Sequence, residues 1–320
     1  MDGALSDAAI RAFAPGDEEE INTAFNRAFG LRRAVADWHW KFPAEPLGRF
    51  ISVAVGSSGQ VLAHYAAVPA VMQVDGRRVV AGQGVDAFAV PECQGQRLYS
   101  RTAQTFHETY GGEGRLELCY VFPGLRSARI FADRLGFERL AEAAVWRRSR
   151  ARRTAWWTGH NVVAATPDER LDTLWRAASP RYPVAVVRDA AWLARRFTGR
   201  PGVDYLHVAA VRGGVVHAWA VLRVEAQRVA WAELVWDGAR SGALAALDRA
   251  AVELARRAGV GTLEMWLEGD AAAAAVFRRL GWRRQPPPAA MLLMARSFTP
   301  AVPTAALRRL YVTMGDADLV

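Results

Sequence analysis

One stretch of the chain, residues 86–137, constrains the fold more than any other. Its pattern predicts a strand over residues 85–90, a turn at Pro91, a short polar loop and a helix over residues 100–110, before a second strand and a second helix. A loop that contains glycine and leads directly into a helix presents unpaired main-chain N–H groups at the positive end of the helix dipole. The loop at residues 94–99 is therefore a predicted diphosphate site.

These elements and their residues resemble the GNAT superfamily of acyl-CoA N-acyltransferases. In that superfamily a phosphate loop, Arg/Gln-x-x-Gly-x-Gly/Ala, follows a strand, and a Leu-Gly-Phe sequence ends a later helix. Here Gln94 matches the first loop position, and residues 135–137 read Leu-Gly-Phe. Arg97 replaces the central glycine, and Tyr99 replaces the last small residue. The sequence Trp-His-Trp-Lys-Phe at residues 38–42 resembles a large bacterial branch of the same superfamily.

The resemblance implies an α/β fold of the α+β kind, with a mixed central sheet flanked by helices. A chain of 320 residues exceeds one ordinary core, so two domains are expected. The second half repeats the plan, and its Leu-Gly-Trp sequence at residues 280–282 parallels the Leu-Gly-Phe of the first half. We expect two tandem GNAT-like domains, at residues 1–150 and 166–320, joined by a basic linker at residues 151–165.

The two halves differ at the phosphate loop. After a strand expected at residues 228–236, the second half reads Asp-Gly-Ala-Arg at residues 237–240, without the Gln/Arg-x-x-Gly spacing. We therefore expect the first domain to bind acyl-CoA. The second domain is expected to hold no cofactor and to shape the acceptor site.

The resemblance also implies which residues contact the co-substrate, an acyl-CoA and most simply acetyl-CoA. The strand before the loop pairs with the pantetheine arm as an added strand would, and the loop amides face the diphosphate. The residues so implied are Phe88, Ala89, Val90, Gln94, Gly95, Gln96, Arg97, Leu98, Tyr99 and Ser100. An ordinary buried strand would equally explain Phe88–Val90. Arg97 gives up the conformational freedom of glycine, and its guanidinium could either bind a phosphate or block the site.

Acyl transfer to an amine needs a proton acceptor for the amine and a proton donor for the leaving thiolate. Asp86 is the first candidate base, because apolar neighbours should raise the pKa of its carboxyl group; alternatively, it holds the neighbouring loop in shape. Glu117 is the second candidate, with an exposed place at a sheet edge as its alternative. The proton-donating tyrosine of the family is absent, since Ala132 stands at its position. Tyr120 is then the expected donor, with Tyr99 or water as alternatives.

The acceptor is expected to contact Trp38, Trp40 and His64. In the family this region lines the acceptor cleft, where indole and imidazole rings could enclose an apolar or sugar-like amine. Simpler interpretations are a hydrophobic cap over the sheet for the tryptophans, Trp38 above all, and a buried histidine with satisfied hydrogen bonds for His64. No metal site is expected, because the histidines are dispersed and Cys93 and Cys119 are not spaced as ligands.

The net charge of +9 comes almost entirely from arginines scattered along the chain, which argues against a nucleic-acid partner. The exception is the basic run at residues 147–153, followed by two tryptophans, which fits either a nucleic-acid patch or an interdomain linker. No apolar run is long enough to span a membrane, and the N-terminus lacks a signal pattern. A cytoplasmic location is therefore expected.

The expected function is acyl-CoA-dependent N-acyl transfer to an amine of a small molecule, by a chain for which a homodimer is allowed. Two alternatives stay open. One is an aminoacyl-tRNA-dependent transferase of the same fold, and the other is a non-catalytic CoA-binding protein. The tail at residues 308–320 could bring Asp316, Asp318 or the terminal carboxylate of Val320 into the active site as a base, or it could be a final strand or a frayed end.

Overall fold

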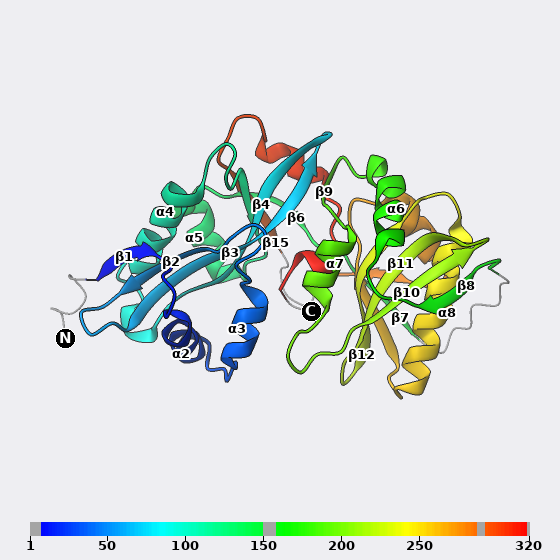
Figure 1. Ribbon diagram of the computed structural model, residues 1–320, viewed down its shortest axis with the longest axis horizontal. Helices are drawn as coiled ribbons and strands as arrows, with labels where there is room; N and C mark the ends of the chain where they lie inside the picture. Colours follow the sequence, from blue (N-terminus) through cyan, green and yellow to red (C-terminus); the bar gives the residue numbers. More distant parts are fainter. Residues whose placement is uncertain (1–7, 150–157, 287–291, 319–320) are drawn as a thin grey trace. The chain divides into compact units, whose positions relative to one another are not determined.

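A computed structural model of the chain describes residues 8–149, 158–286 and 292–318, which form two compact units (Figure 1). Unit 1 contains Met1–Val71, Arg78–Ala141 and Leu292–Leu307, and unit 2 contains Met72–Arg77, Glu142–Met291 and Arg308–Val320. The boundaries expected from the sequence describe contiguous halves, whereas each unit includes segments from both halves. Across the described ranges no helix is both long and apolar enough to cross a bilayer.

Unit 1 is a mixed sheet with helices on both faces. Its strands are β1 (Ala9–Ala12), β2 (Phe50–Val55), β3 (Val61–Val74), β4 (Arg77–Ala89), β5 (Leu118–Val121), β15 (Leu292–Ser297) and β6 (Glu138–Glu142), in the spatial order β1-β2-β3-β4-β5-β15-β6. Its helices are α2 (Glu18–Phe29), α3 (Val35–Lys41), α4 (Leu98–Tyr110) and α5 (Leu125–Leu135). Strand β4 runs parallel to β5, whereas β1 with β2, β2 with β3, and β5 with β15 are antiparallel.

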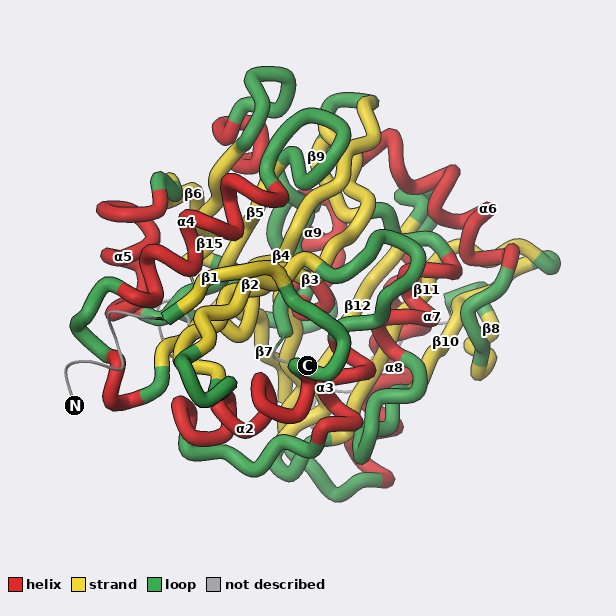
Figure 2. Tube along the Cα trace, turned by 60° about the vertical axis from the view of Figure 1, so that its left-hand side comes forward, coloured by secondary structure: helices red, strands yellow, loops and turns green. Residues whose placement is uncertain are grey.

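A long hairpin formed by β3 and β4 contains the strand that the sequence predicted at residues 85–90. Strands β3 and β4 run side by side through the middle of the sheet (Figure 2). Asp75 and Gly76 join them, both with positive φ, at 49° and 86°. An Asp-Gly pair in this conformation matches the right-handed twist of the flanking strands. This turn signal is local, but the prediction from sequence did not use it.

Successive side chains of β3 point alternately to the two faces of the unit 1 sheet. His64 faces α2 and α3, with its ring 6.3 Å from that of Phe42. Tyr65 faces α4 and α5, and its ring lies 4.9 Å from that of Phe106 and 6.4 Å from that of Phe131. Helices from the two ends of the N-terminal half therefore bury opposite faces of the same strands.

Unit 2 has the same plan. Its strands are β7 (Val145–Ser149), β8 (Asn161–Ala164), β10 (Leu206–Arg212), β11 (Val215–Val224), β12 (Arg228–Trp236), β13 (Thr262–Trp266) and β14 (Arg283–Gln285), in the order β14-β7-β13-β12-β11-β10-β8. Its helices are α6 (Glu169–Ala178), α7 (Ala190–Phe197), α8 (Ser241–Arg257) and α9 (Ala271–Arg279). A short strand, β9 (Val184–Val186), pairs with Met72–Val74 at the tip of the long hairpin, which belongs to this unit.

The two sheets match strand for strand, except that each is completed by a strand from the other half of the sequence. In unit 1 β15 lies between β5 and β6, and in unit 2 β7 lies between β13 and β14. Both β7 and β15 are the last strands of their halves. Backbone pairing at this position needs only an extended apolar segment, so either strand can complete either sheet.

Candidate functional site

The central strands of unit 1 separate beyond a short paired region. β4 pairs with β5 from Ala81 to Gln83, whose partner is Tyr120, and β5 ends at the next residue. Among the described residues no strand continues this pairing along residues 84–89 of β4. We call this gap, between residues 84–89 of β4 and the end of β5, the β4–β5 opening. Asp86 lies within it with φ of 47°, a left-handed conformation that non-glycine residues rarely adopt.

The loop after β4 delivers the chain to an uncapped helix start. No side chain caps α4, its first turn has no acidic residue, and its first intrahelical bond runs from the Arg101 N–H to the Arg97 carbonyl at 3.0 Å. The N–H groups of Leu98, Tyr99 and Ser100 therefore have no intrahelical partner. Together with the helix dipole, they form a site suited to an anion.

Arg97 keeps the backbone shape that the family obtains with glycine. Its φ is 62° and its ψ is 0°, and Gly95 also has positive φ, at 83°. The left-handed conformation costs a residue with a Cβ atom about 1–2 kcal/mol. The expectation that arginine gives up the glycine conformation is therefore wrong. The Arg97 side chain is exposed, and no described residue forms a hydrogen bond or ion pair with it.

Asp86 is held by two cations rather than left free as a base. Its Oδ2 accepts a hydrogen bond from Arg33 Nη1 at 2.5 Å, and its Oδ1 accepts one from Lys41 Nζ at 2.6 Å. Burial alone would raise the pKa of this carboxyl group, but the charges of Lys41 and Arg33 outweigh burial and lower the pKa to about 2. The raised pKa expected from the sequence is wrong, and a carboxylate with a pKa of about 2 that is paired with two cations is a weaker proton acceptor than the one expected. The structural alternative for Asp86 fits these contacts.

His64 lies beside Asp86 on the neighbouring strand. Its Nδ1 is 2.7 Å from the Asp86 carbonyl oxygen, and its ring stacks on Phe88 with centroids 5.3 Å apart. Burial lowers the pKa of His64 to about 4, so the ring is neutral at ordinary pH. A neutral ring that donates from Nδ1 keeps an acceptor lone pair on Nε2, which is buried and has no hydrogen-bond partner among the described residues.

The two tryptophans of the predicted acceptor site differ in burial. Trp38 has no exposed surface and packs between Phe13 and Phe42, with ring centroids 5.6 and 5.3 Å away. It fills the core beneath α3 and cannot line an open cleft, which corrects its assignment to substrate binding. Trp40 is half-buried on the same helix. Residues two apart on a helix point in different directions, which explains the difference.

Glu117 immediately precedes β5, whereas Tyr120 is the last but one residue of that strand. Glu117 is 4% exposed, so the exposed edge position expected for it is wrong. The main-chain N–H of Glu117 donates a hydrogen bond to the Val80 carbonyl, and its carbonyl accepts one from the Phe298 N–H. Tyr120 stands at the last β4–β5 pair, beside the opening. Three residues of strand span about 10 Å, so the structure brings Tyr120 but not Glu117 to the opening.

Two protonated groups beside the opening were missed from the sequence. A Cβ atom built on Gly84 would lie 3.6 Å from Tyr65 Oη and 3.4 Å from Cys119 Sγ. Burial raises the pKa of Tyr65 well above its usual value and raises that of Cys119 to about 12, so both keep their protons. The position of Tyr65 on the face opposite His64 follows from strand alternation, which was the available signal.

The corresponding opening in unit 2 is occupied by the end of the chain. β12 pairs with β13 only from Arg228 to Trp231. Beyond that point the Tyr311 hydroxyl donates to the Leu234 carbonyl at 2.8 Å, and Val312 pairs antiparallel with Glu268. Both Tyr311 and Val312 are buried. Residues 311–317, which we call the tail segment, are therefore an integral part of unit 2 rather than a frayed end.

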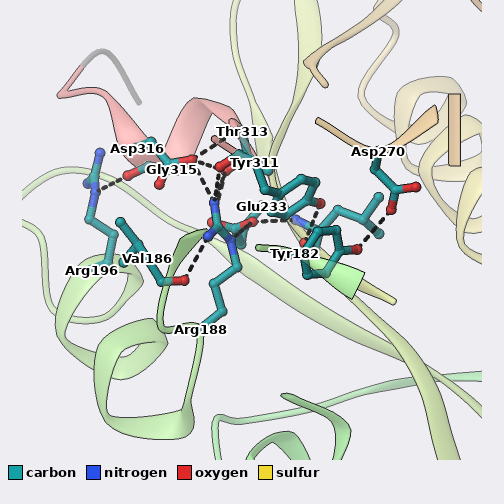
Figure 3. Close-up of polar contacts among 11 residues, drawn as sticks. Tyr182, Val186, Arg188, Arg196, Glu233, Asp270, Tyr311, Thr313, Gly315 and Asp316 are labelled. Atoms are coloured by element: carbon teal, nitrogen blue, oxygen red, sulfur yellow. Dashed lines mark hydrogen bonds and ion pairs between the residues drawn. The ribbon is translucent and has the colours of Figure 1, made fainter. Parts of the chain in front are cut away.

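A buried charge cluster anchors the tail segment (Figure 3). Arg188, on the segment before α7, donates to Glu233 at 3.0 Å and to Asp316 at 2.6 Å, and all three side chains are fully buried. Burial raises the pKa of Glu233 to about 7 and also raises that of Asp316, although Arg188 opposes both shifts. One guanidinium between two carboxyl groups favours retention of a proton by the pair. Asp316 thus anchors the tail segment, and Val320 lies outside the described residues.

Two arginines of the basic run at residues 147–153 form ion pairs within unit 2. Arg147 forms an ion pair with Glu264, and Arg148 forms a fully buried one with Asp248. Residues 150–157 lie outside the described ranges. In the part of the chain that the structure describes, no three His, Cys, Asp or Glu side chains are grouped so that they could hold a metal ion.

Solved structures share this fold, although no protein-family profile and no curated protein sequence matches the chain. A probable N-acyltransferase of unknown function from Enterococcus faecalis V583 superposes with a TM-score of 0.70 at 12% identity, over 91% of this chain and 73% of that one. A GCN5-related N-acetyltransferase from Anabaena variabilis gives a TM-score of 0.70 at 10% identity, with the same coverage.

Two further structures extend the likeness. A GCN5-related N-acetyltransferase from Kribbella flavida gives a TM-score of 0.67 at 14% identity, over 91% of this chain and 71% of that one. Saccharomyces cerevisiae N-myristoyltransferase, solved with bound myristoyl-CoA, gives 0.59 at 9% identity, over 98% and 89%. With two mixed sheets flanked by helices and separated central strands, this chain has the fold of the GNAT superfamily of N-acyltransferases.

Proposed function

We propose that the chain is an acyl-CoA-dependent N-acyltransferase that acts on an amine of a small molecule, with acetyl-CoA as the first donor to test. The observation that carries this proposal is the β4–β5 opening, which leads into the uncapped start of α4. An extended arm can pair with the free edge of β4 while a diphosphate lies against the helix N-terminus. The neighbouring structures named as N-acetyltransferases support the same chemistry.

Within the predicted cofactor strand, Ala89 is the residue that we expect to pair with the pantetheine arm. The Val90 N–H donates to the Leu62 carbonyl at 2.9 Å, so the main chain of Val90 faces β3. Successive residues of a strand direct their N–H and C=O groups to alternate sides, so those of Ala89 face the opening. The side chains of Phe88 and Val90 are buried in the core of unit 1.

For the diphosphate, we propose the N–H groups of Leu98, Tyr99 and Ser100 as the main ligands. The Arg97 guanidinium, which has no partner among the described residues, is free to form charge-assisted bonds to a phosphate. Gln94, Gly95 and Gln96 frame the turn, and the Gln96 amide donates to the Glu92 carbonyl at 3.0 Å. We therefore assign Arg97 to binding rather than to blocking the site.

Proton transfer needs a different assignment from the one based on sequence. The ion pairs of Asp86 disfavour it as a base, and His64 has no exposed surface, as Trp38 has none, so neither Asp86 nor His64 is assigned as the proton acceptor. Tyr120, at the point where β4 and β5 separate, is the proposed proton donor to the thiolate. Tyr65, whose hydroxyl lies next to Gly84, is the second candidate donor.

Binding of co-substrate fragments tests the proposal directly. Calorimetry with acetyl-CoA, pantetheine and ADP should give measurable binding for all three, with acetyl-CoA tightest. Ala89→Pro removes the N–H group that faces the opening, so it should weaken pantetheine and acetyl-CoA but leave ADP unchanged. No binding of acetyl-CoA at millimolar concentration would contradict the proposal.

Release of the CoA thiol, measured over a panel of amino sugars, polyamines and aminoglycosides, then tests the reaction. Tyr120→Phe should lower kcat about 10²–10⁴-fold with little change in KM, as expected for loss of a general acid. Unchanged turnover in this variant would transfer the role to Tyr65. Tight acetyl-CoA binding without thiol release from any amine would favour the non-catalytic alternative, and salt-sensitive binding of charged tRNA would favour the aminoacyl-tRNA donor.

A further inference from the structure

A cavity of about 720 Å³ lies wholly within unit 2, and none of the residues that line it belongs to the β4–β5 opening. It is formed where the chain leaves β13 and enters α9, with β7 and β14 beside it. Its volume falls within the range of small-molecule sites in proteins. Nothing in the proposed acyltransfer chemistry uses it.

The floor of this cavity is apolar and rigid. It is made by Trp146, Leu267, Ala271 and Ala274. The Trp146 indole is 4% exposed and donates to the Leu267 carbonyl at 3.1 Å, which fixes the orientation of the ring. A ring fixed in this way adds a small, rigid apolar patch to the floor, beside the more accessible Ala271 and Ala274.

Positively charged side chains surround this floor. Four arginines line the cavity: Arg278, Arg283, Arg284 and Arg309. Two of them have acidic partners, since Arg284 pairs with Glu268 at 3.3 Å and Arg309 pairs with Asp75 at 2.6 Å. The remaining carboxyl group, Asp270, accepts hydrogen bonds from Arg181 and from the Tyr182 hydroxyl.

Arg278 and Arg283 therefore supply charge that no carboxylate balances among the described residues. Arg283 Nη1 donates to the carbonyl oxygens of Arg278 and Trp282, at 3.2 and 3.0 Å, which holds its guanidinium at the end of α9. Nη2 and Nε of Arg283 and the whole Arg278 guanidinium are left to bind a ligand. A guanidinium presents paired donors that match the oxygens of a carboxylate or phosphate.

We propose that this cavity binds an amphiphilic oxyanion, with its apolar body on the Trp146 floor and its carboxylate or phosphate group between Arg278 and Arg283. The alternative is an arginine-rich surface that is simply solvated, as expected from the composition. The concave apolar floor distinguishes the two, because a solvated arginine face needs no such surface. The site is independent of acyl-CoA binding in unit 1.

Calorimetric titration of the full-length protein with matched probes tests this proposal. 1-Naphthyl phosphate and 1-naphthoate combine an aromatic body with each type of oxyanion, whereas 1-naphthol and inorganic phosphate each provide one half. At least one of the combined probes should bind at least tenfold more tightly than either half. Comparison of the two combined probes distinguishes phosphate from carboxylate recognition. Equal binding of inorganic phosphate and the combined probes would overturn the proposal.

Variants on α9 locate the site. Arg278→Ala should weaken the tighter combined probe about tenfold, the loss expected for one charge-assisted contact, whereas Arg279→Ala removes the same charge from the next residue, which does not line the cavity. Ala274→Leu should exclude the probe by filling the floor, and Ala272→Leu on the exposed side is its control. Equal effects within either pair would mean a diffuse charge effect or nonspecific binding and would refute the site.

Discussion

The two units have the same sheet topology, but they differ at the opening between their central strands. A segment of the chain covers this opening in unit 2, whereas no described strand covers it in unit 1. In unit 1 the edge of β4 beyond Gln83 has no strand beside it among the described residues, and the chain then enters α4 through an uncapped turn. In unit 2 the edge of β12 beyond Trp231 is covered by the tail segment, through Tyr311 and Leu234. A shared fold therefore provides the gap, and local segments decide whether a ligand can enter it.

The helices that follow the two openings, α4 in unit 1 and α8 in unit 2, also begin in different surroundings. In unit 1 the first turn of α4 is uncapped, and the exposed Arg97 stands before it. In unit 2 a Cβ atom built on Gly242 would lie 2.5 Å from the Thr158 carbonyl oxygen, so an acceptor group already faces the start of α8. An oxygen in that place repels a phosphate. The comparison supports the proposal that unit 1, rather than unit 2, binds acyl-CoA.

The buried carboxyl groups of the two openings provide the strongest test of this comparison. Asp86→Asn removes the negative charge that pairs with the largely buried Arg33 and Lys41, so we expect a loss of about 3–5 kcal/mol in the local stability of unit 1. Glu233→Gln leaves Arg188 paired with Asp316, so we expect a loss below about 1 kcal/mol in unit 2. Hydrogen exchange of the amides in β4 and β12 measures both. Equal losses would mean that the two carboxyl groups contribute equally to the stability of their units, and this would contradict the comparison.

Arg97 tests whether the open gap serves a diphosphate. Arg97→Gly retains the left-handed turn and removes the guanidinium, so acetyl-CoA affinity should fall about 10–100-fold, with a smaller change in stability. Arg101→Ala removes the same charge from an exposed position one turn into α4 and should change affinity less than threefold. Calorimetry measures both. Tighter acetyl-CoA binding by Arg97→Gly would mean that the arginine blocks the site.

Tyr311 tests how firmly the filled gap is closed. Tyr311→Phe leaves the Leu234 carbonyl buried without its donor, at a cost of about 1–2 kcal/mol. The amides of the tail segment should exchange faster, while those of β4 in unit 1 should not change. Unaltered exchange in the tail would show that packing of the ring, rather than the hydrogen bond, holds the segment.

The contributions of Glu233 and Asp86 to the stability of their units should change in opposite directions as the pH rises. The pKa of Glu233 is raised from 4.5 to about 7 in the folded state, so its contribution to the stability of unit 2 is complete below pH 4.5 and is lost as the pH rises to about 7. The pKa of Asp86 is lowered from 3.8 to about 2, so its contribution to unit 1 is complete above pH 3.8 and is lost as the pH falls toward 2. Hydrogen exchange of the tail segment and of β4, corrected for intrinsic rates, measures both trends. A tail that becomes more protected between pH 5 and 7 would refute the assignment for Glu233.

Much of the first unit could be predicted from local sequence, because its signals lie close together along the chain. The loop at residues 94–99, α4 and the helix that ends at Leu135 all follow from glycine positions and apolar spacing. The failures are also local in origin. The Asp75-Gly76 turn was available in the sequence, and the exposed position of Glu117 was assigned from alternation alone.

Asp86 shows why the candidate site was harder to predict than the fold. The two cations that set its pKa lie 45 and 53 residues earlier in the chain, one on α3 and one in the loop before it. No spacing rule connects such distant residues to a strand. Arg97 shows a related failure, since the sequence showed that a glycine was missing but not that the backbone kept its conformation.

The sequence by itself determined most of the succession of helices and strands and the place of the loop at residues 94–99, because local propensity and periodicity act over neighbouring residues. Only the tertiary structure decided that β7 and β15 complete each other's sheets, that the tail fills one opening, and that Asp86 is neutralised by Lys41 and Arg33. These outcomes depend on which distant segments can bury apolar surface and pair charges together, and that choice is made by the folded chain as a whole.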